Sequence, residues 1–156
     1  MDGTARLLVI GQDPATDELI AHRSFVGTSG QRLQGLLKKI GLKRSYVIVN
    51  TFLYPVNGQF DATLKRISLE PWLLDFRNAT LDLILTESPL EAIIAMGSGA
   101  QHTVNHWPGK GSLPVFNLPH PAAAESLVLP SWNEQLSKIQ AAITPDEGML
   151  ADANPY

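Results

Sequence analysis

The chain has 156 residues, a formal net charge of −3 and 44% hydrophobic residues, which suits one compact domain with a real core. A protein that coats nucleic acid through long-range attraction carries a large excess of Lys and Arg, and this chain does not. There is no Cys, and the four His residues are scattered without metal-ligand spacing, so disulfides, thiolate nucleophiles and cysteine-ligated clusters are excluded. We therefore expect any catalysis to proceed without a metal or a cofactor.

The sequence contains no run of about 18 apolar residues and no basic-then-apolar leader ahead of the first expected strand. Neither a membrane span nor a secretory signal is supported. We expect a cytoplasmic protein that does not use a membrane, and we expect a monomer.

Four short apolar runs predict β-strands, at residues 7–10, 46–49, 92–96 and 114–116, with helical patterns between them. One helix is expected to end at Gly41, and another to begin at Ser131 as its N-cap. The apolar positions expected to pack in the core are Leu33, Leu36, Leu37 and Ile40 of a first helix, Trp72, Leu73, Phe76, Leu81 and Leu85 of a second, and Leu136, Ile139 and Ile143 of the last.

This alternation predicts an α/β fold, a three-layer α/β/α sandwich around a four-stranded parallel sheet with the order 2-1-3-4. We expect residues 1–143 to form a single domain. Residues 144–156 are poor in apolar side chains and are predicted to be a flexible tail. The loop at 54–61 contains Pro55 and Gly58 and is long enough to have a function.

Small or polar residues follow each expected strand. Asp13, Asn50 and His120 follow the first, second and fourth, and Gly97-Ser98-Gly99 follows the third. Because the carboxyl ends of parallel strands meet at one edge of a sheet, these residues are expected to line a single crevice. The alternative for Asp13 alone is an Asx-turn that closes the strand, since Asp-Pro is common in turns.

The chemistry of this set limits the reaction. A dinucleotide fingerprint and a phosphate-loop signature are both absent, which disfavours hydride transfer and nucleoside-triphosphate chemistry. The groups present suit a reaction in which a carboxylate faces positive charge while neutral donors receive negative charge on a leaving group.

Taken together and in this order, the motifs resemble those of the uracil-DNA glycosylase superfamily over about residues 6–140. Residues 11–14, Gly-Gln-Asp-Pro, resemble its water-activating motif, and residues 48–51, Ile-Val-Asn-Thr, resemble the segment of its base-reading asparagine. Residues 119–121, Pro-His-Pro, resemble its histidine motif, and Phe25 lies where the family has an aromatic that stacks on uracil. Residues 25–33 are similar to the helix entry of the family's iron–sulfur branch, whose cluster this Cys-free chain cannot hold.

The resemblance implies hydrolysis of the N-glycosidic bond of a flipped-out uracil in DNA. Asp13 and His120 would be catalytic: Asp13 would stabilise a cation-like sugar and orient water, and a neutral His120 would donate a hydrogen bond to uracil O2. Asn50 would read O4 and N3–H of the base, and Gln12 and Phe25 would also line the pocket. Ala15 occupies the place of the Tyr that blocks the thymine methyl in the mainstream branch, so His22 or Phe52 would close that space, or 5-substituted uracils would be accepted.

The resemblance also implies contacts with the DNA backbone, from Ser29, Gly30 and Arg32 at the start of a helix and from Ala122 after the histidine motif. An ordinary helix cap explains Ser29 almost as well. Leu127 or Leu129 is a candidate for the side chain inserted into the vacated base stack, although a Leu here could equally close the core. Two other functions remain open, a non-catalytic base-binding module on the same fold and a small-molecule α/β hydrolase that uses Gly97-Ser98-Gly99.

Overall fold

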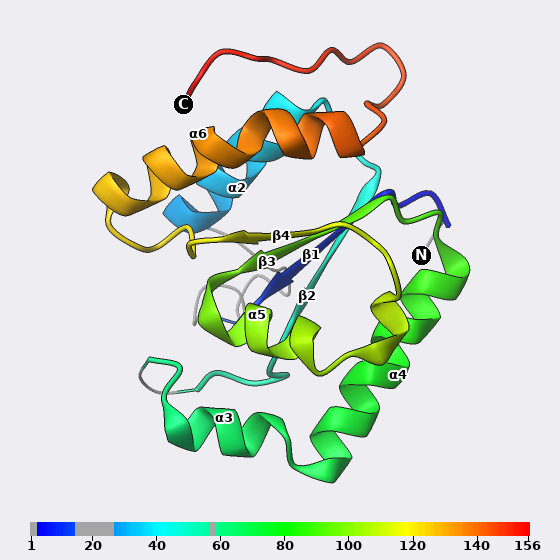
Figure 1. Cartoon of the computed structure of the whole chain (residues 1–156), viewed down its shortest axis with the longest axis vertical. Coiled ribbons are helices and arrows are strands. Elements are labelled where there is room, and N and C mark those ends of the chain that lie inside the picture. Colours follow the sequence, from blue (N-terminus) through cyan, green and yellow to red (C-terminus); the bar gives the residue numbers. More distant parts are fainter. Residues whose placement is uncertain (1–2, 15–26, 57–58) are drawn as a thin grey trace.

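The computed structural model describes residues 3–14, 27–56 and 59–156. Over these residues the chain forms a four-stranded parallel sheet with the order β2-β1-β3-β4 (Figure 1). The strands are β1 Leu7–Gly11, β2 Tyr46–Asn50, β3 Ala92–Met96 and β4 Val115–Leu118. The predicted parallel sheet and its order are confirmed.

Helices cover both faces of this sheet (Figure 1). On one face lie α2 Gly27–Ile40 and α6 Glu125–Ala142, and on the other lie α4 Pro71–Glu87 and α5 Gly97–Asn105. A short helix, α3 Ala62–Ser68, precedes α4, and a 3₁₀ turn, η1 Pro108–Lys110, follows α5. The arrangement is the predicted three-layer α/β/α sandwich.

Alternation of side chains along the strands divides the core between these two layers. Leu7 and Val9 of β1 pack with the apolar face of α2 and with Trp132 and Leu136 of α6. Leu8 and Ile10 point the other way, toward α4, α5 and Trp107. Every residue of β1 and β3 is buried, as expected for central strands of a parallel sheet covered on both faces.

The expected core positions of α4 need a correction. Leu73 and Leu81 are buried, but Trp72 and Phe76 are 57% and 54% exposed. The helix carries apolar residues on both its inner and its outer face, so the sequence alone did not show which of them face the sheet.

The expected start of the last helix is also wrong. α6 begins at Glu125 with Ala124 as its N-cap, and Pro130 lies inside it. A proline usually marks a helix boundary, and this is why Ser131 looked like a cap. β4 runs from 115 to 118 rather than from 114 to 116. Gly97-Ser98-Gly99, which follows β3 as expected, forms the first turn of α5.

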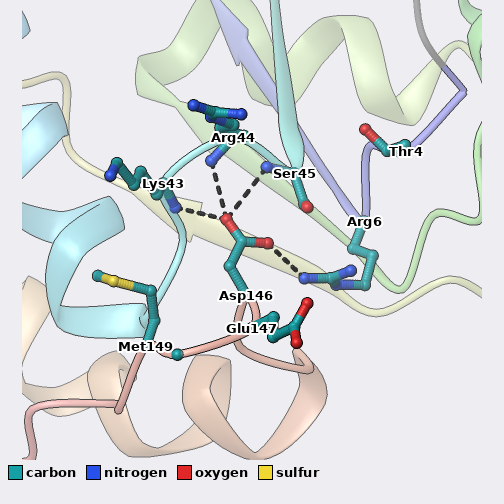
Figure 2. A pocket seen from close by; sticks show the side chains of 9 residues that line it. Thr4, Arg6, Lys43, Arg44, Ser45, Asp146, Glu147 and Met149 are labelled. Carbon is teal, nitrogen blue, oxygen red and sulfur yellow. Dashed lines mark hydrogen bonds and ion pairs between the residues drawn. The ribbon is translucent and has the colours of Figure 1, made fainter.

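Residues 144–156 contain no helix or strand but do contact the domain. Asp146 forms an ion pair with Arg6 and accepts hydrogen bonds from the backbone N–H groups of Lys43 and Arg44, at 2.6 and 2.8 Å (Figure 2). Further along, Tyr156 packs edge-on against Trp132, with ring centroids 5.6 Å apart. Flexibility of this tail stays a prediction, and these contacts are the ones that motion would have to break.

A cavity of about 660 Å³ lies beside Asp146, lined by residues of the amino-terminal ends of β1 and β2 and of the tail (Figure 2). Arg6 and Ser45 belong to its wall. It sits at the edge of the sheet opposite the predicted crevice, because the strands are parallel and Arg6 and Ser45 precede β1 and β2.

The charge state of Asp146 depends on these contacts. Burial alone would raise the pKa of Asp146, but hydrogen bonds from Ser45, Arg44 and Lys43 outweigh it and hold that pKa well below its usual value. A carboxylate with a lowered pKa stabilises the folded state above the unfolded-state pKa of about 4, and this contribution is lost as the pH falls below it.

We predict that Asp146→Asn lowers the free energy of unfolding by about 1–3 kcal/mol at pH 7, because charge-assisted hydrogen bonds are lost. The deficit should shrink as the pH is lowered from 4 toward 2, where wild type loses the same contribution. Urea unfolding at pH 7 and pH 3 measures both values, and Glu147→Gln is the neighbouring control. Equal stabilities of wild type and Asp146→Asn at pH 7 would contradict the assignment.

Candidate active site

The residues predicted to line the crevice follow the strands at the carboxyl edge of the sheet. Asn50 is the last residue of β2 and pairs in register with Gly11, the last residue of β1. On the other side, Met96 of β3 pairs with Leu118 of β4, two residues before His120. The strand ends that carry Asn50 and Asp13 are thus neighbours, and β3 separates them from the end of β4 that precedes His120.

The carboxylate of Asp13 is held from two directions. Its Oδ1 accepts a hydrogen bond from Nε2 of Gln12 at 3.1 Å, and its Oδ2 accepts one from the backbone N–H of Val56 at 3.0 Å. Val56 lies in the long loop after β2, so this loop has a clear structural role. Both bonds fix the orientation of the carboxylate.

Backbone pairing between the chain segments continues beyond the strands. The N–H of Thr51 donates to the carbonyl of Gly11 at 3.0 Å, and the N–H of Phe52 donates to the carbonyl of Gln12 at 2.9 Å. The buried Thr51 hydroxyl also donates to Gly11 O at 2.9 Å and accepts from Thr103 Oγ1 at 2.9 Å. Thr51 therefore joins the ends of β1 and β2 to α5. Its residue type gave no signal in the sequence, since a Thr after a strand is common.

Two glycines in the first turn of α5 allow the flanking residues to approach closely. A Cβ at Gly99 would lie 3.1 Å from Cγ of Gln12 and 3.2 Å from the ring of Phe60. A Cβ at Gly97 would lie 3.3 Å from Cβ of His120, and Gly97 has a φ of +85°, which L side chains rarely adopt. Gln12 and His120 therefore both lie against the first turn of α5, and the side chain of Gln12 bonds to Asp13.

The tautomer of His120 follows from its hydrogen bond. The backbone N–H of Ala122 donates to Nδ1 of His120 at 3.1 Å, so Nδ1 is an acceptor and the proton of a neutral ring lies on Nε2. The preceding residue is anchored as well, because Nε1 of Trp132 donates to the carbonyl of Pro119 at 3.2 Å. Donation of a hydrogen bond by a neutral His120 to the base stays a prediction.

The half-buried Asn50 faces the layer of α2 and α6. Side chains alternate along β2, and Tyr46 and Ile48 pack in that layer whereas Val47 and Val49 pack in the other. Asn50 is two residues after Ile48, so its side chain points to the same face of the sheet. It therefore lies on the same side of the sheet as the start of α2 and the segment from His120 to α6.

A family model of the uracil DNA glycosylase superfamily matches residues 1–140. The chain belongs to the uracil DNA glycosylase superfamily. A search of curated proteins found no match. Membership indicates a glycosylase-type function in DNA repair, and the matched residues include all the predicted catalytic, base-reading and DNA-contact positions.

The residues expected to contact DNA contribute to local structure in this family member. Arg32 Nη1 donates to the carbonyls of Pro121 and Ala123, at 2.8 and 3.3 Å, and its Nη2 pairs with Glu125 at 3.1 Å. Arg32 therefore holds the segment after His120 against α2. Its contact with a phosphate stays a prediction.

The other DNA-contact candidates lie at the ends of elements. Ser29 is half-buried and Gly30 is buried in the first turn of α2, where backbone N–H groups have no partner within the helix. Ala122 is exposed, and the Leu127 side chain is 58% exposed in the first turn of α6. Leu129 is half-buried. Phe25, Ala15 and His22 fall outside the described residues, whereas Phe52 is buried beside Leu64 and Leu73.

Sequence reasoning missed a buried guanidinium beneath the site. Arg77 of α4 is 5% exposed, and its Nη1 donates to the carbonyl of Thr51 at 3.5 Å. Burial lowers the pKa of Arg77. From the sequence alone, an Arg in an amphipathic helix is expected to face solvent. Only the tertiary contact with the end of β2 shows that Arg77 is buried.

His102, one turn further along α5, packs beside the site. Its ring lies 5.4 Å from that of Phe60 and 4.2 Å from that of His106, measured between centroids. Burial, followed by the neighbouring charges of His106, Arg77 and Lys65, lowers the pKa of His102. His102 is therefore a neutral support for Phe60 at neutral pH.

In the part of the chain that the structure describes, no three His, Asp or Glu side chains gather as a possible metal site. None of the described helices is long and apolar enough to cross a membrane.

We predict that Thr51→Val destabilises the protein by about 1–2 kcal/mol, because the hydroxyl links to Gly11 and Thr103 are buried and water cannot replace them. Thr86→Val is the matched control: its hydroxyl also bonds a backbone carbonyl, that of Asp82 at 2.9 Å, but on the exposed side of α4. Urea denaturation of the two variants measures the difference. A loss that is no larger for Thr51→Val than for Thr86→Val would rule out the linking role.

Proposed function

We propose that this protein hydrolyses the N-glycosidic bond between uracil and deoxyribose in DNA and leaves an abasic site. The observation that carries the proposal is that His120 and Gln12, whose side chain bonds to Asp13, both approach the first turn of α5. Asn50 ends β2 at the same edge of the sheet. The family match over residues 1–140 supports the glycosylase class of the reaction.

Asp13 is assigned to the sugar. As the bond from C1′ to the base breaks, positive charge develops on the sugar, and a carboxylate close to it lowers the energy of that state. The hydrogen bonds from Val56 and Gln12 hold Asp13 in one orientation before the reaction begins. Its remaining acceptor capacity can orient the water that adds to C1′.

His120 is assigned to the leaving base. The bonding electrons leave with uracil, and negative charge spreads onto the pyrimidine O2. The N–H of Ala122 keeps the His120 proton on Nε2, where a neutral imidazole can donate to that oxygen. A preorganised donor of this kind contributes about 3–4 kcal/mol to transition-state stabilisation.

Asn50 is assigned to base recognition. Its amide can donate to uracil O4 and accept from N3–H, whereas cytosine presents the opposite donors and acceptors and leaves buried polar atoms unpaired. The base must first leave the stack, and Phe25, as proposed from the resemblance, would stack on the flipped ring. Because Ala15 stands in the place of the methyl-blocking Tyr, the proposal includes acceptance of 5-substituted uracils. Assays with thymine and related bases test this part.

The DNA backbone is proposed to bind at the first turn of α2, where Ser29, Gly30 and Arg32 lie, and at Ala122. The exposed Leu127 is the better placed of the two wedge candidates, since Leu129 is half-buried. The cytoplasmic location and the monomeric state stay predictions.

We predict that wild type releases uracil from a labelled oligonucleotide, detected as strand scission after alkali, and that Asp13→Asn and His120→Ala each lower the single-turnover rate at least about 100-fold. Glu134→Gln on the exposed side of α6 is the control and should keep the wild-type rate. No abasic product from wild type on single or double strands would refute the function. Undiminished product from the Asp13→Asn/His120→Ala double variant would refute the role assignments.

We predict that Asn50→Asp lowers the rate of uracil release by about 100-fold or more, because a carboxylate cannot donate a hydrogen bond to O4. The preference for uracil over cytosine should also become smaller, because a carboxylate can accept a hydrogen bond from the cytosine amino group. Parallel assays on uracil, cytosine and thymine oligonucleotides measure the preference. A uniform loss on all bases would assign Asn50 to structure rather than to recognition.

A further inference from the structure

One exposed face of α4 carries a line of apolar side chains, Trp72, Phe76, Ala79 and Leu83, here named the α4 stripe. The spacing of four, three and four residues brings them to one side of the helix. Trp72, Phe76 and Leu83 are 57%, 54% and 54% exposed. Single exposed apolar residues are ordinary, but three large ones in line over three turns are typical of an interaction surface.

The stripe is not needed to hold α4 in place. The opposite face of the helix packs on the protein through Leu73, Leu81 and Ile84, all of which are buried. In Figure 1, α4 lies at the outside of the molecule. Among the described elements η1 contacts α4, and the neighbouring Trp107 bonds to Asp82 rather than covering the apolar side chains of the stripe.

Charge on the helix distinguishes between possible occupants. With 100° of rotation per residue, Asp75 and Asp82 fall along one border of the stripe and Glu87 along the other. The one basic residue of α4, Arg77, is buried on the inner side. Oδ1 of Asp82 already accepts a hydrogen bond from Nε1 of Trp107 at 2.7 Å, so Asp75 and Glu87 carry the exposed acidic charge of the two borders. The helix itself offers no exposed cation.

Acidic borders disfavour two of the three candidate occupants. Docking α4 against the α4 of a second copy would bring acidic borders together in either orientation, which is costly. A membrane surface is anionic and attracts amphipathic helices with Lys and Arg at their borders rather than Asp and Glu. A protein helix with an apolar seam and basic borders complements both the shape and the charge of the stripe.

We propose that the α4 stripe is a docking site for an amphipathic helix of a partner protein, with Leu-like side chains on its seam and Lys or Arg on its borders. From Trp72 to Leu83 the stripe spans 12 residues, a rise of about 16 Å over 11 steps of 1.5 Å, so three turns of the partner cover it. The site is independent of the proposed chemistry, because its residues lie on the outer face of α4 and not at the carboxyl edge of the sheet.

The test uses the full chain and two designed helical peptides with the same leucine seam, one with Lys and one with Glu at the border positions. Fluorescence anisotropy of each peptide gives its affinity for the protein. Acrylamide quenching of tryptophan fluorescence shows where the peptide binds, because Trp72 is exposed whereas Trp107 and Trp132 are buried. We expect the Lys-bordered peptide to bind at least about 10-fold more tightly and to shield Trp72 from acrylamide.

Three variants make the test specific. Trp72→Ala/Phe76→Ala should weaken binding of the Lys-bordered peptide at least about 10-fold, and Leu150→Ala, at a side chain that is 88% exposed in the tail, should not. Asp75→Lys/Glu87→Lys should reverse the preference toward the Glu-bordered peptide. All three should keep the wild-type rate of uracil excision, so failure of this proposal and failure of the proposed function are distinguishable.

Several outcomes would overturn the proposal. They are equal affinity for the two peptides, affinity unaffected by Trp72→Ala/Phe76→Ala, and no binding of the Lys-bordered peptide at millimolar concentration. Concentration-dependent dimerisation of wild type that Trp72→Ala/Phe76→Ala abolishes would assign the stripe to a second copy. Loss of binding to phosphatidylserine-containing vesicles in the same variant would assign it to a membrane.

Discussion

The structure depends on β1 pairing in parallel with strands on both sides. Its five residues are buried on both faces, and the register with β2 and β3 leaves no freedom to shift without moving every side chain to the other layer. Pairing continues past the strand through Thr51 and Phe52, so the chain carrying Gln12 and Asp13 is fixed by backbone hydrogen bonds. The backbone of Asp13, the candidate catalytic carboxylate, is therefore held in place by the sheet.

The residues at the carboxyl edge of the sheet could be predicted from the sequence, because the prediction needs only the local pattern of each strand and the parallel topology. A buried apolar run ends in a polar residue, and parallel topology then brings Asp13, Asn50 and His120 to one edge whatever their separation in the chain. The partners of these residues were not predictable. Val56 N–H and the Ala122 N–H belong to backbone that any residue supplies, and their contacts arise only when loops fold back.

The errors in α4 and α6 have physical causes as well. A helical pattern shows that apolar residues recur on a face, but α4 has two such faces, and only packing shows that Leu81 is inside while Trp72 and Phe76 are outside. In α6, packing of Val128 and Trp132 into the core offsets the disruption expected from Pro130. Tertiary contacts outweighed the local signal in both helices.

Close packing around α5 gives the site its geometry. Gly97 and Gly99 let the side chains of His120 and Gln12 approach the helix more closely than a Cβ at either glycine would permit, so packing against the α5 backbone fixes where these two side chains lie. Preorganised groups lose no energy to reorientation as charge develops on sugar and base. A methyl group at Gly99 would push against Gln12, and through its bond to Asp13 would disturb the carboxylate without touching it. The glycines are thus as much a part of the candidate site as the groups that carry its charge.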